Sequence, residues 1–425
     1  MNQFLLEAPS RLNATISLPA SKSISNRALI ISALARQQDA AHCADRLTHL
    51  SDCDDTTVIR EAMIHMPDVI DIKAAGTAMR FMTAYLACTP SGTHTLTGTE
   101  RMKQRPIRPL VDALRLLGAD IAYAGEEGFP PLTITGRSID GGTITVAGDI
   151  SSQFISALIL VAPTFKHGLE LKLTGTIASR PYIDLTLWTM REFGAKADWA
   201  SADTIAIAPA PYSLPADYYI ESDWSAASYW YEALALCHDP NAEIRLEGLM
   251  DGSKQGDSSV RYIFSLLGIK TEFESRQPGR PTTITLKKRM DCVPRLDYDF
   301  TSIPDLAQTI VVTCAMLGVP FHFKGLQTLR IKETDRLFAL RTELAKMGYK
   351  VEERNASELI WDGTRLPVAS TPCIDTYHDH RMALAFAPTA FVAPIVINDP
   401  EVVSKSYPRF WDDLRSVAFN ISNPD

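Results

Sequence analysis

The chain has 425 residues, 46% of them hydrophobic and 22% charged, with a formal net charge of −8. This length allows a large core and favours two lobes, and an acidic chain without a basic block is not expected to bind nucleic acid nonspecifically. The seven cysteines form no CxxC pair, which argues against a disulfide framework or a zinc site. No uncharged stretch reaches the roughly 20 residues of a membrane span, so we expect a soluble cytoplasmic protein without a membrane partner.

Two types of helix are predicted to alternate along the chain. The first type is Ala-rich and apolar almost all round, which indicates a buried helix. Its six copies begin near Ser23, Thr77, Ser152, Ser225, Pro304 and His380. Because a helix start presents unpaired N–H groups and the positive end of the helix dipole, these polar openings favour anion binding.

The second type of helix is amphipathic and ends at a glycine that precedes a strand. These glycines are Gly118, Gly194, Gly268 and Gly348, which lie 76, 74 and 80 residues apart. Glycine suits the left-handed backbone of a helix C-cap, and a spacing of this size indicates a repeated supersecondary unit.

Strand-like runs with alternating, β-branched residues separate the helices. Clear examples span residues 143–146, 169–173, 283–286 and 395–397. The helices and strands form six units, which divide naturally into two lobes of three.

Nine short motifs combine the helix starts with cations and hydroxyl groups. In chain order they span residues 18–29, 75–80, 101–107, 151–154, 179–184, 303–305, 331–337, 379–383 and 404–408. The first motif reads LPASKSISNRAL, the second AGTAMR and the seventh IKETDRL. Together they resemble the 5-enolpyruvylshikimate-3-phosphate synthase family of enolpyruvyl transferases over essentially the whole chain.

The resemblance implies an α/β (α+β) fold, a two-lobed inside-out α/β barrel. Each lobe would hold three repeats of a helix–strand unit around buried Ala-rich helices. Residues 1–19 and 223–425 would form the C-terminal lobe, with the phosphoenolpyruvate cations and the catalytic carboxylates. Residues 20–222 would form the N-terminal lobe, which binds shikimate 3-phosphate, and the active site would lie in the cleft between the lobes.

The resemblance also implies a reaction. The enolpyruvyl (1-carboxyvinyl) group of phosphoenolpyruvate would move to the 5-hydroxyl of shikimate 3-phosphate through a tetrahedral intermediate, with release of inorganic phosphate. This step belongs to the shikimate pathway to chorismate and the aromatic amino acids. A monomer is expected, with no cofactor and no metal, because Lys and Arg already offset the substrate anions.

Residue by residue, the resemblance assigns two overlapping substrate sites. The shikimate 3-phosphate site would comprise Lys22, Ser23, Arg27, Ser151, Ser152, Gln153, Ser179, Tyr182, Asp305 and Lys332. The phosphoenolpyruvate site would comprise Lys22, Gly76, Arg105, Gln153, Arg336, Arg381 and Lys405. Asp305 is expected to be the catalytic base, with Glu333 and Lys22 as the candidates for proton transfer at C3 of phosphoenolpyruvate.

Elementary chemistry supports these assignments. The two substrates carry two phosphates and two carboxylates between them, so a common site needs several cations and many hydrogen-bond donors. Arginine offers planar, two-pronged recognition of these groups and lysine offers a point charge. Glycine at position 76 would let the backbone approach a ligand closely.

Three positions depart from the usual pattern of the family. Ala74 stands where an Asn is usual, Phe81 where a Pro is common, and Thr328 where an Asn is often found. The first change removes a polar side chain near phosphoenolpyruvate, whereas the Thr328 hydroxyl could still donate to the shikimate phosphate. None of the three removes a charge, so they bear on binding strength and inhibitor response rather than on activity.

Two other functions share this scaffold. A UDP-N-acetylglucosamine enolpyruvyl transferase carries a reactive Cys just before an Arg-Pro pair, but residues 99–106 contain none. A non-catalytic anion-binding protein would be expected to lose Asp305 or Glu333, and both are present.

Other motifs point to no metal or nucleotide. The acidic residues at 52–55 are expected to form a polar turn, because neighbours on an extended segment point in opposite directions. His378 and His380 lie beside Arg381, which favours an anion over a bound cation. No GxGxxG or Walker sequence opens a helix, so a nucleotide cofactor is not expected.

Overall fold

A computed structural model of the protein describes residues 2–36, 46–277, 279–289, 291–368 and 370–424. The chain divides into two compact units: unit 1 is Met1–Pro19 with Glu221–Asp425, and unit 2 is Ala20–Ile220. The chain therefore passes from unit 2 back into unit 1 after Ile220, whereas the sequence analysis places this boundary after Ser222. The difference arises because Ser222 N donates to Gly248 O at 2.9 Å and Glu221 accepts from Trp224 Nε1 at 2.7 Å, both inside unit 1.

Unit 2 holds three buried helices, α1 (Lys22–Ala35), α3 (Gly76–Cys88) and α6 (Ser152–Val161). Among the described residues, its other helical segments are α2 (Asp54–His65), α4 (Glu100–Lys103), α5 (Arg108–Leu116), η2 (Ala162–Thr164) and α7 (Arg180–Glu192). One sheet has the order β4 (Val69–Asp71), β5 (Thr93–Thr97), β7 (Leu132–Thr135) and β6 (Asp120–Tyr123). A second has the order β8 (Gly142–Ala147), β9 (Leu169–Thr174), β11 (Thr204–Ile207) and β10 (Ala197–Trp199). A parallel pair is formed by β3 (Leu47–Thr48) and β12 (Tyr218–Tyr219).

Unit 1 repeats this plan with buried helices α8 (Trp224–Leu236), α10 (Ala307–Leu317) and α12 (His380–Phe386). Its other α-helices are α9 (Val260–Leu266), α11 (Arg336–Lys346) and α13 (Phe410–Ser416). The short 3-10 segments are η3 (Gly256–Ser259), η4 (Pro304–Leu306), η5 (Gln327–Ile331), η6 (Ala387–Phe391) and η7 (Pro400–Lys405).

Three four-stranded sheets complete unit 1. The first has the order β2 (Asn13–Ser17), β13 (Glu243–Leu249), β15 (Thr282–Lys288) and β14 (Ile269–Phe273). The second has the order β16 (Leu296–Asp299), β17 (Phe321–Lys324), β19 (Glu358–Trp361) and β18 (Glu352–Arg354). The third has the order β20 (Cys373–Ile374), β21 (Ile395–Asn398), β1 (Gln3–Glu7) and β22 (Asn420–Ser422).

All five four-stranded sheets share one topology. Each starts with a parallel pair and continues with two antiparallel pairings, as in β16–β17–β19–β18. In the sheet just named, the buried helix α10 connects the two parallel strands, because parallel neighbours need a crossover connection. In the third sheet of unit 1 the N-terminal strand β1 pairs with both β21 and β22. The N-terminal strand is therefore built into a sheet of unit 1.

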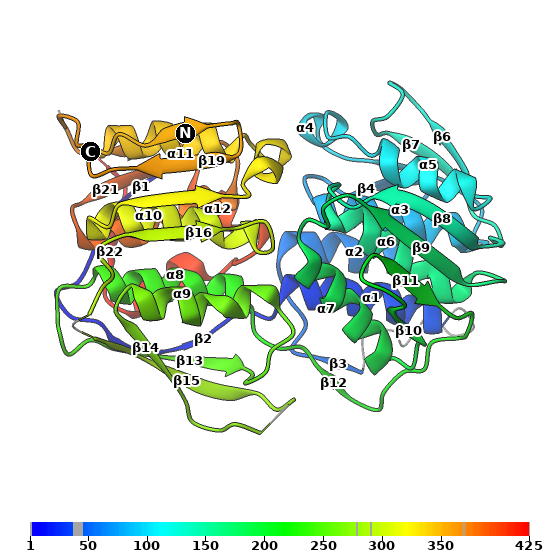
Figure 1. The fold of residues 1–425 in the computed structure, drawn as a ribbon, viewed down its shortest axis with the longest axis horizontal. Helices are drawn as coiled ribbons and strands as arrows, with labels where there is room; N and C mark the ends of the chain where they lie inside the picture. Colours follow the sequence, from blue (N-terminus) through cyan, green and yellow to red (C-terminus); the bar gives the residue numbers. More distant parts are fainter. Residues whose placement is uncertain (1, 37–45, 278, 290, 369, 425) are drawn as a thin grey trace. The chain divides into compact units, whose positions relative to one another are not determined.

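The helices confirm both sequence patterns. The six Ala-rich segments form the buried helices, and in each unit the sheets lie outside them (Figure 1). The four predicted glycines follow α5, α7, α9 and α11, with φ of 103°, 81°, 85° and 87°. Each unit has its own hydrophobic core. Across the described part of the chain, no helix has the length and apolar character needed to cross a bilayer.

Candidate active site

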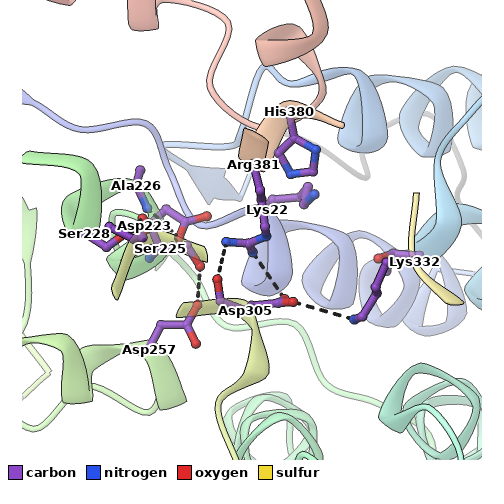
Figure 2. Close-up of polar contacts among 12 residues, drawn as sticks. Lys22, Asp223, Ser225, Ala226, Ser228, Asp257, Asp305, Lys332, His380 and Arg381 are labelled. Carbon is purple, nitrogen blue, oxygen red and sulfur yellow. Dashed lines mark hydrogen bonds and ion pairs between the residues drawn. The ribbon is translucent and has the colours of Figure 1, made fainter. Parts of the chain in front are cut away.

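Asp305 is the centre of a charged cluster in unit 1. It lies in η4, the turn that leads into α10, and its side chain is 23% exposed. Arg381 Nη2 lies 3.2 Å from Asp305 Oδ2, and Arg381 Nη1 donates to the Asp305 carbonyl oxygen at 2.8 Å. Lys332 Nζ and Arg336 Nη1 lie 3.6 and 3.5 Å from the other carboxylate oxygen. Figure 2 shows the carboxylate between Arg381 and Lys332.

Burial and these cations act on Asp305 in opposite directions. Burial raises the pKa of the carboxyl, but Arg381, Lys332 and Arg336 together outweigh burial and hold the pKa well below its usual range. The group is therefore ionised at neutral pH and is a weak base while these cations contact it. An anion that draws the cations away would make Asp305 more basic.

Arg336 is the most deeply buried cation of the cluster. It opens α11 and its side chain is 2% exposed. Its Nε donates to Asp379 Oδ2 at 2.7 Å and its Nη2 to Asp379 Oδ1 at 3.2 Å, a two-pronged pair with a fully buried carboxylate. Burial lowers the pKa of Arg336, but Asp379 and Glu333 outweigh burial and raise the pKa above its usual value. The guanidinium is therefore a fixed positive charge.

Glu333 joins Lys405 to this cluster. Lys405 Nζ, at the end of η7, lies 2.7 Å from Glu333 Oε1, and Arg336 Nη2 donates to Glu333 Oε2 at 2.9 Å. Both members of the Lys405–Glu333 pair are largely buried. Unit 1 thus gathers all of its predicted site residues, which are Asp305, Lys332, Glu333, Arg336, Arg381 and Lys405.

The start of α8, like that of α12, is capped by an aspartate. Asp223 caps this helix by accepting from Ser225 N at 2.7 Å, and Ser225 Oγ donates to Asp257 (Figure 2). Two carboxylates therefore already occupy the positive end of this helix. The predicted preference of this opening for an anion is satisfied by the side chains of the protein.

In unit 2, Lys22 forms an ion pair that the sequence analysis did not foresee. Lys22 opens α1, and its Nζ lies 3.4 Å from Oδ2 of the buried Asp55. The acidic residues at 52–55 are not simply a polar turn, because Asp54 and Asp55 form the first turn of α2. A negative charge at a helix start is stabilising, so this spacing could have been read as a helix opening.

Arg27 lies on α1 and is 4% exposed. Its guanidinium donates to neutral oxygens: Ser23 O at 2.8 Å, Tyr182 O at 3.1 Å, Ser156 Oγ at 3.2 Å and Thr186 Oγ1 at 2.7 Å. These bonds account for four of its five N–H donors. Burial lowers the pKa of Arg27 to about 10, which leaves it charged at neutral pH. It ties α1 to α6 and α7.

Gly76 opens α3 and lies against Arg105. A Cβ built on Gly76 would be 2.7 Å from Arg105 Nη1, so a larger residue would push this guanidinium away. Arg80 holds the two segments together, because its Nη1 donates to Gly76 O at 3.1 Å and its Nη2 to Pro106 O at 3.2 Å. The two predicted phosphoenolpyruvate residues of the AGTAMR and RMKQRPI motifs are therefore neighbours.

Ser23 is the second residue of α1, and the other remaining predicted residues lie at the starts of α6 and α7. Ser151 is the N-cap of α6, and its hydroxyl accepts from Gln153 N at 3.4 Å, while Ser152 is buried. Gln153 Nε2 donates to Thr77 Oγ1 at 3.2 Å, which joins the starts of α6 and α3. Ser179 precedes α7 in a left-handed conformation with φ of 55°.

Sequence reasoning missed two partners of the predicted cations. Asp379 opens the motif at residues 379–383 and has no predicted role, yet it holds Arg336 with both oxygens. Asp55 belongs to the predicted polar turn, yet it pairs with Lys22. A buried carboxylate beside a buried cation is the expected arrangement, but a sequence does not say which pairs meet in space.

The Arg and Lys side chains of the unit 1 cluster contact carboxylates, and Arg27 in unit 2 contacts hydroxyl groups. Side chains of this kind are suited to bind anions. Over the described ranges, no group of His, Cys, Asp and Glu side chains is arranged to hold a metal ion.

Comparisons with known proteins agree with this chemistry. The family model for EPSP synthase (3-phosphoshikimate 1-carboxyvinyltransferase) matches residues 6–414. A protein named 3-phosphoshikimate 1-carboxyvinyltransferase from Bacteroides fragilis (strain YCH46) is 56% identical over 421 residues, which cover 99% of this chain and 98% of that protein. A protein of the same name from Photobacterium profundum is 36% identical, with coverage of 98% and 99%.

A solved structure shows the same fold. The EPSP synthase from Acinetobacter baumannii has a TM-score of 0.77 and 20% sequence identity, and the match covers 100% of both chains. The expected α/β fold is thereby confirmed, and the family is established by full-length sequence identity and not by this likeness. On these grounds, the chain belongs to the EPSP synthase (3-phosphoshikimate 1-carboxyvinyltransferase) family.

Proposed function

We propose that this chain is a 3-phosphoshikimate 1-carboxyvinyltransferase, which transfers the enolpyruvyl group of phosphoenolpyruvate to the 5-hydroxyl of shikimate 3-phosphate and releases inorganic phosphate. The observation that carries this conclusion is the 56% identity to an enzyme of that name over nearly the full length of both chains. The reaction places the enzyme on the route to chorismate and the aromatic amino acids. The cysteine-dependent UDP-N-acetylglucosamine reaction is not favoured, since residues 99–106 hold no Cys.

Phosphoenolpyruvate is the substrate we assign to the most cation-rich groups. In unit 1 these are Arg336, Arg381 and Lys405, and in unit 2 they are Lys22, Gly76, Arg105 and Gln153. Support comes from the charge balance of unit 1, where Lys332 and these three cations face the carboxylates of Asp305, Glu333 and Asp379. The cluster therefore keeps a surplus of positive charge for a dianionic or trianionic ligand.

Shikimate 3-phosphate is assigned to hydroxyl donors and fewer cations. The proposed residues are Lys22, Ser23, Arg27, Ser151, Ser152, Gln153, Ser179, Tyr182, Asp305 and Lys332. The described residues accept from four of the five N–H groups of Arg27, and the fifth is proposed to donate to the shikimate carboxylate. Thr328 Oγ1 is buried and has no hydrogen-bond partner among the described residues, so this hydroxyl can donate to the shikimate phosphate in place of the usual Asn.

The proposed mechanism begins with an exchange of ionic partners. The phosphate and carboxylate of phosphoenolpyruvate take over Arg381 and Arg336, which now lower the pKa of Asp305. Asp305 then becomes basic enough to accept the proton of the 5-hydroxyl as that oxygen attacks C2. The same cations stabilise the charge on the phosphate that leaves the tetrahedral intermediate.

Protonation of C3 is assigned to Glu333 and Lys22. Glu333 contacts Lys405 and Arg336, so it acts as an acid only after it gains a proton. Lys22 carries transferable protons on Nζ and is held by Asp55. The two residues can exchange roles between addition and elimination, because the elimination step removes a proton from the same carbon.

The assay for this function is phosphate release. Purified protein, phosphoenolpyruvate and shikimate 3-phosphate should release inorganic phosphate and form the enolpyruvyl product, whereas UDP-N-acetylglucosamine in place of shikimate 3-phosphate should give none. The opposite preference would overturn the proposal. We further propose a cytoplasmic monomer without metal or cofactor. Light scattering of the purified protein tests whether it is a monomer, and activity after treatment with EDTA tests whether it needs a metal.

Arg27→Ala is expected to weaken shikimate 3-phosphate binding by about 1.5–3 kcal/mol, the value of a hydrogen bond to a charged group. The Michaelis constant for phosphoenolpyruvate should change much less, and the comparison of the two constants is the measurement. The substitution also leaves the hydroxyl groups of Ser156 and Thr186 with one partner fewer, so thermal stability should fall as well. Equal effects on both substrates would contradict the assignment of Arg27.

Gly76→Ala is expected to raise the Michaelis constant for phosphoenolpyruvate, because the new Cβ displaces Arg105 from its place beside the start of α3. The expected loss is about 1–3 kcal/mol of binding. Gly125→Ala is the matched control, since the nearest atom to its Cβ would be Pro131 Cδ at 3.7 Å, an ordinary contact. An unchanged constant in Gly76→Ala would show that Arg105 has room to move without loss.

A further inference from the structure

The turn that leads into α12 has an unusual backbone. Tyr377 and His378 are consecutive non-glycine residues with φ of 53° and 55°. The left-handed conformation costs an ordinary residue on the order of 1 kcal/mol, and such conformations persist when the surrounding structure enforces them. The turn ends at Asp379, the N-cap of α12.

One buried carboxylate contacts two residues of this turn. Glu343 lies on α11, and its side chain is fully buried. The Tyr377 hydroxyl donates to Glu343 Oε1 at 2.6 Å, and Asp375 N donates to Glu343 Oε2 at 3.0 Å. Lys346 Nζ, one turn along α11, lies 2.7 Å from the same carboxylate and balances its charge. Glu343 therefore binds the turn through a side chain and through the backbone.

Asp379 connects the turn to the proposed active site. This carboxylate holds Arg336 with two hydrogen bonds of 2.7 and 3.2 Å, and its Oδ1 accepts from Arg381 N at 3.0 Å. Arg336 and Glu343 both lie on α11. Helix α11 thus bonds to the 375–379 segment through both Arg336 and Glu343, and the position of Asp379 depends on both contacts.

We propose that Glu343 and Tyr377 are positioning residues that fix the distance between the Arg336 and Arg381 guanidinium groups by holding the left-handed turn before Asp379. The inference rests on the proposed function, in which these two arginines bind phosphoenolpyruvate. A bond to the Tyr377 hydroxyl offsets the cost of the left-handed backbone. Without it the turn relaxes, Asp379 shifts, and the two cations no longer match the ligand.

Tyr377→Phe tests the proposal by removing one hydroxyl group. The Michaelis constant for phosphoenolpyruvate should rise about 5- to 30-fold, the effect of one lost hydrogen bond to a buried carboxylate, while kcat and the constant for shikimate 3-phosphate change far less. Glu343→Gln should act on the same constant. Tyr349→Phe is the matched control, because this buried ring packs on Trp361, with the ring centroids 5.5 Å apart, and the kinetics of this variant should equal those of the parent protein.

A second substitution distinguishes positioning from a general loss of stability. His378 is exposed, and His378→Gly makes the left-handed conformation easier without touching the bond to Glu343. Added to Tyr377→Phe, it should restore much of the lost affinity for phosphoenolpyruvate. A merely structural defect would not be rescued in this way, because a new glycine also favours the unfolded chain.

The outcomes separate this inference from the proposed function. If the parent protein releases phosphate from its substrates but Tyr377→Phe leaves the Michaelis constant for phosphoenolpyruvate unchanged, the positioning role is overturned and the function stands. A rise in that constant that His378→Gly does not reduce also overturns it. A parent protein without phosphate release overturns the proposed function, whatever the variants do.

Discussion

Asp305→Asn is expected to lower kcat at least about a hundredfold, the low end for the loss of a general base. The amide keeps the size of the side chain and can still bond to a ring hydroxyl, so the Michaelis constant for shikimate 3-phosphate should change little. Binding of phosphoenolpyruvate should not weaken, because Arg381, Lys332 and Arg336 lose a competing carboxylate. Steady-state kinetics with each substrate varied in turn give all three quantities.

The matched control for this substitution is Asp297→Asn. Asp297 lies on β16 in the same unit, is exposed, and contacts Arg295 at 2.9 Å. An amide there should leave turnover unchanged. Near-normal turnover in Asp305→Asn would remove this residue from the role of base and leave it as a binding group.

The ion pairs of Asp305 also make a prediction about pH. The cations hold the pKa of this carboxyl below its unfolded value of about 3.9. A depressed pKa stabilises the fold above the unfolded value, and this contribution is lost as the pH falls through the lower, folded value. The difference in free energy of unfolding between the parent protein and Asp305→Asn should therefore be constant near neutral pH and shrink below about pH 4.

The periodic features of the sequence predicted the scaffold well. Apolar Ala-rich segments such as the one that opens at Lys22 became buried helices, because a helix without a polar face has to be covered. The four glycines at helix ends took positive φ, since the C-cap geometry strains any residue with a Cβ. Local rules of this kind depend on a few neighbouring residues, and a sequence displays those directly.

Contacts between residues far apart in the chain could not be predicted from the sequence in this way. The sequence pointed to Arg336 and Arg381 as ligands of an anion, but not to Asp379 as the carboxylate that fixes both. Nor did it reveal that Arg27 uses most of its donors inside unit 2. Such contacts join residues far apart in the chain, and their existence depends on the packing of several helices at once.

The boundary at which the chain passes from unit 2 into unit 1 illustrates the same limit. Ser222 and Glu221 follow the short strand β12 without any change of composition at the boundary. Their assignment to unit 1 depends on Glu221, whose carboxylate accepts from Met250 N at 2.9 Å and Gln255 Nε2 at 3.0 Å. A buried carboxylate needs such donors, and they come from a segment some thirty residues away.

Arg336→Met is expected to destabilise the protein by about 3–5 kcal/mol, the usual effect of removing one partner of a buried ion pair. Asp379 is fully buried and would lose both bonds to the guanidinium, while Glu333 would keep Lys405. Turnover should also be lost, because the proposed site loses a fixed cation. Denaturant unfolding of the two proteins, followed by circular dichroism, measures the first effect.

A paired substitution separates the two consequences. Replacing a buried ion pair by apolar residues of similar volume is often neutral for stability, so Arg336→Met with Asp379→Leu should recover most of the lost free energy of unfolding. Recovery should fall short by about 1 kcal/mol, because Asp379 also caps α12 through Arg381 N. Catalysis should not return with stability, since no cation is restored. If activity recovered in the paired variant, Arg336 would act only as a partner for Asp379, and the binding of phosphoenolpyruvate would have to rest on the remaining cations.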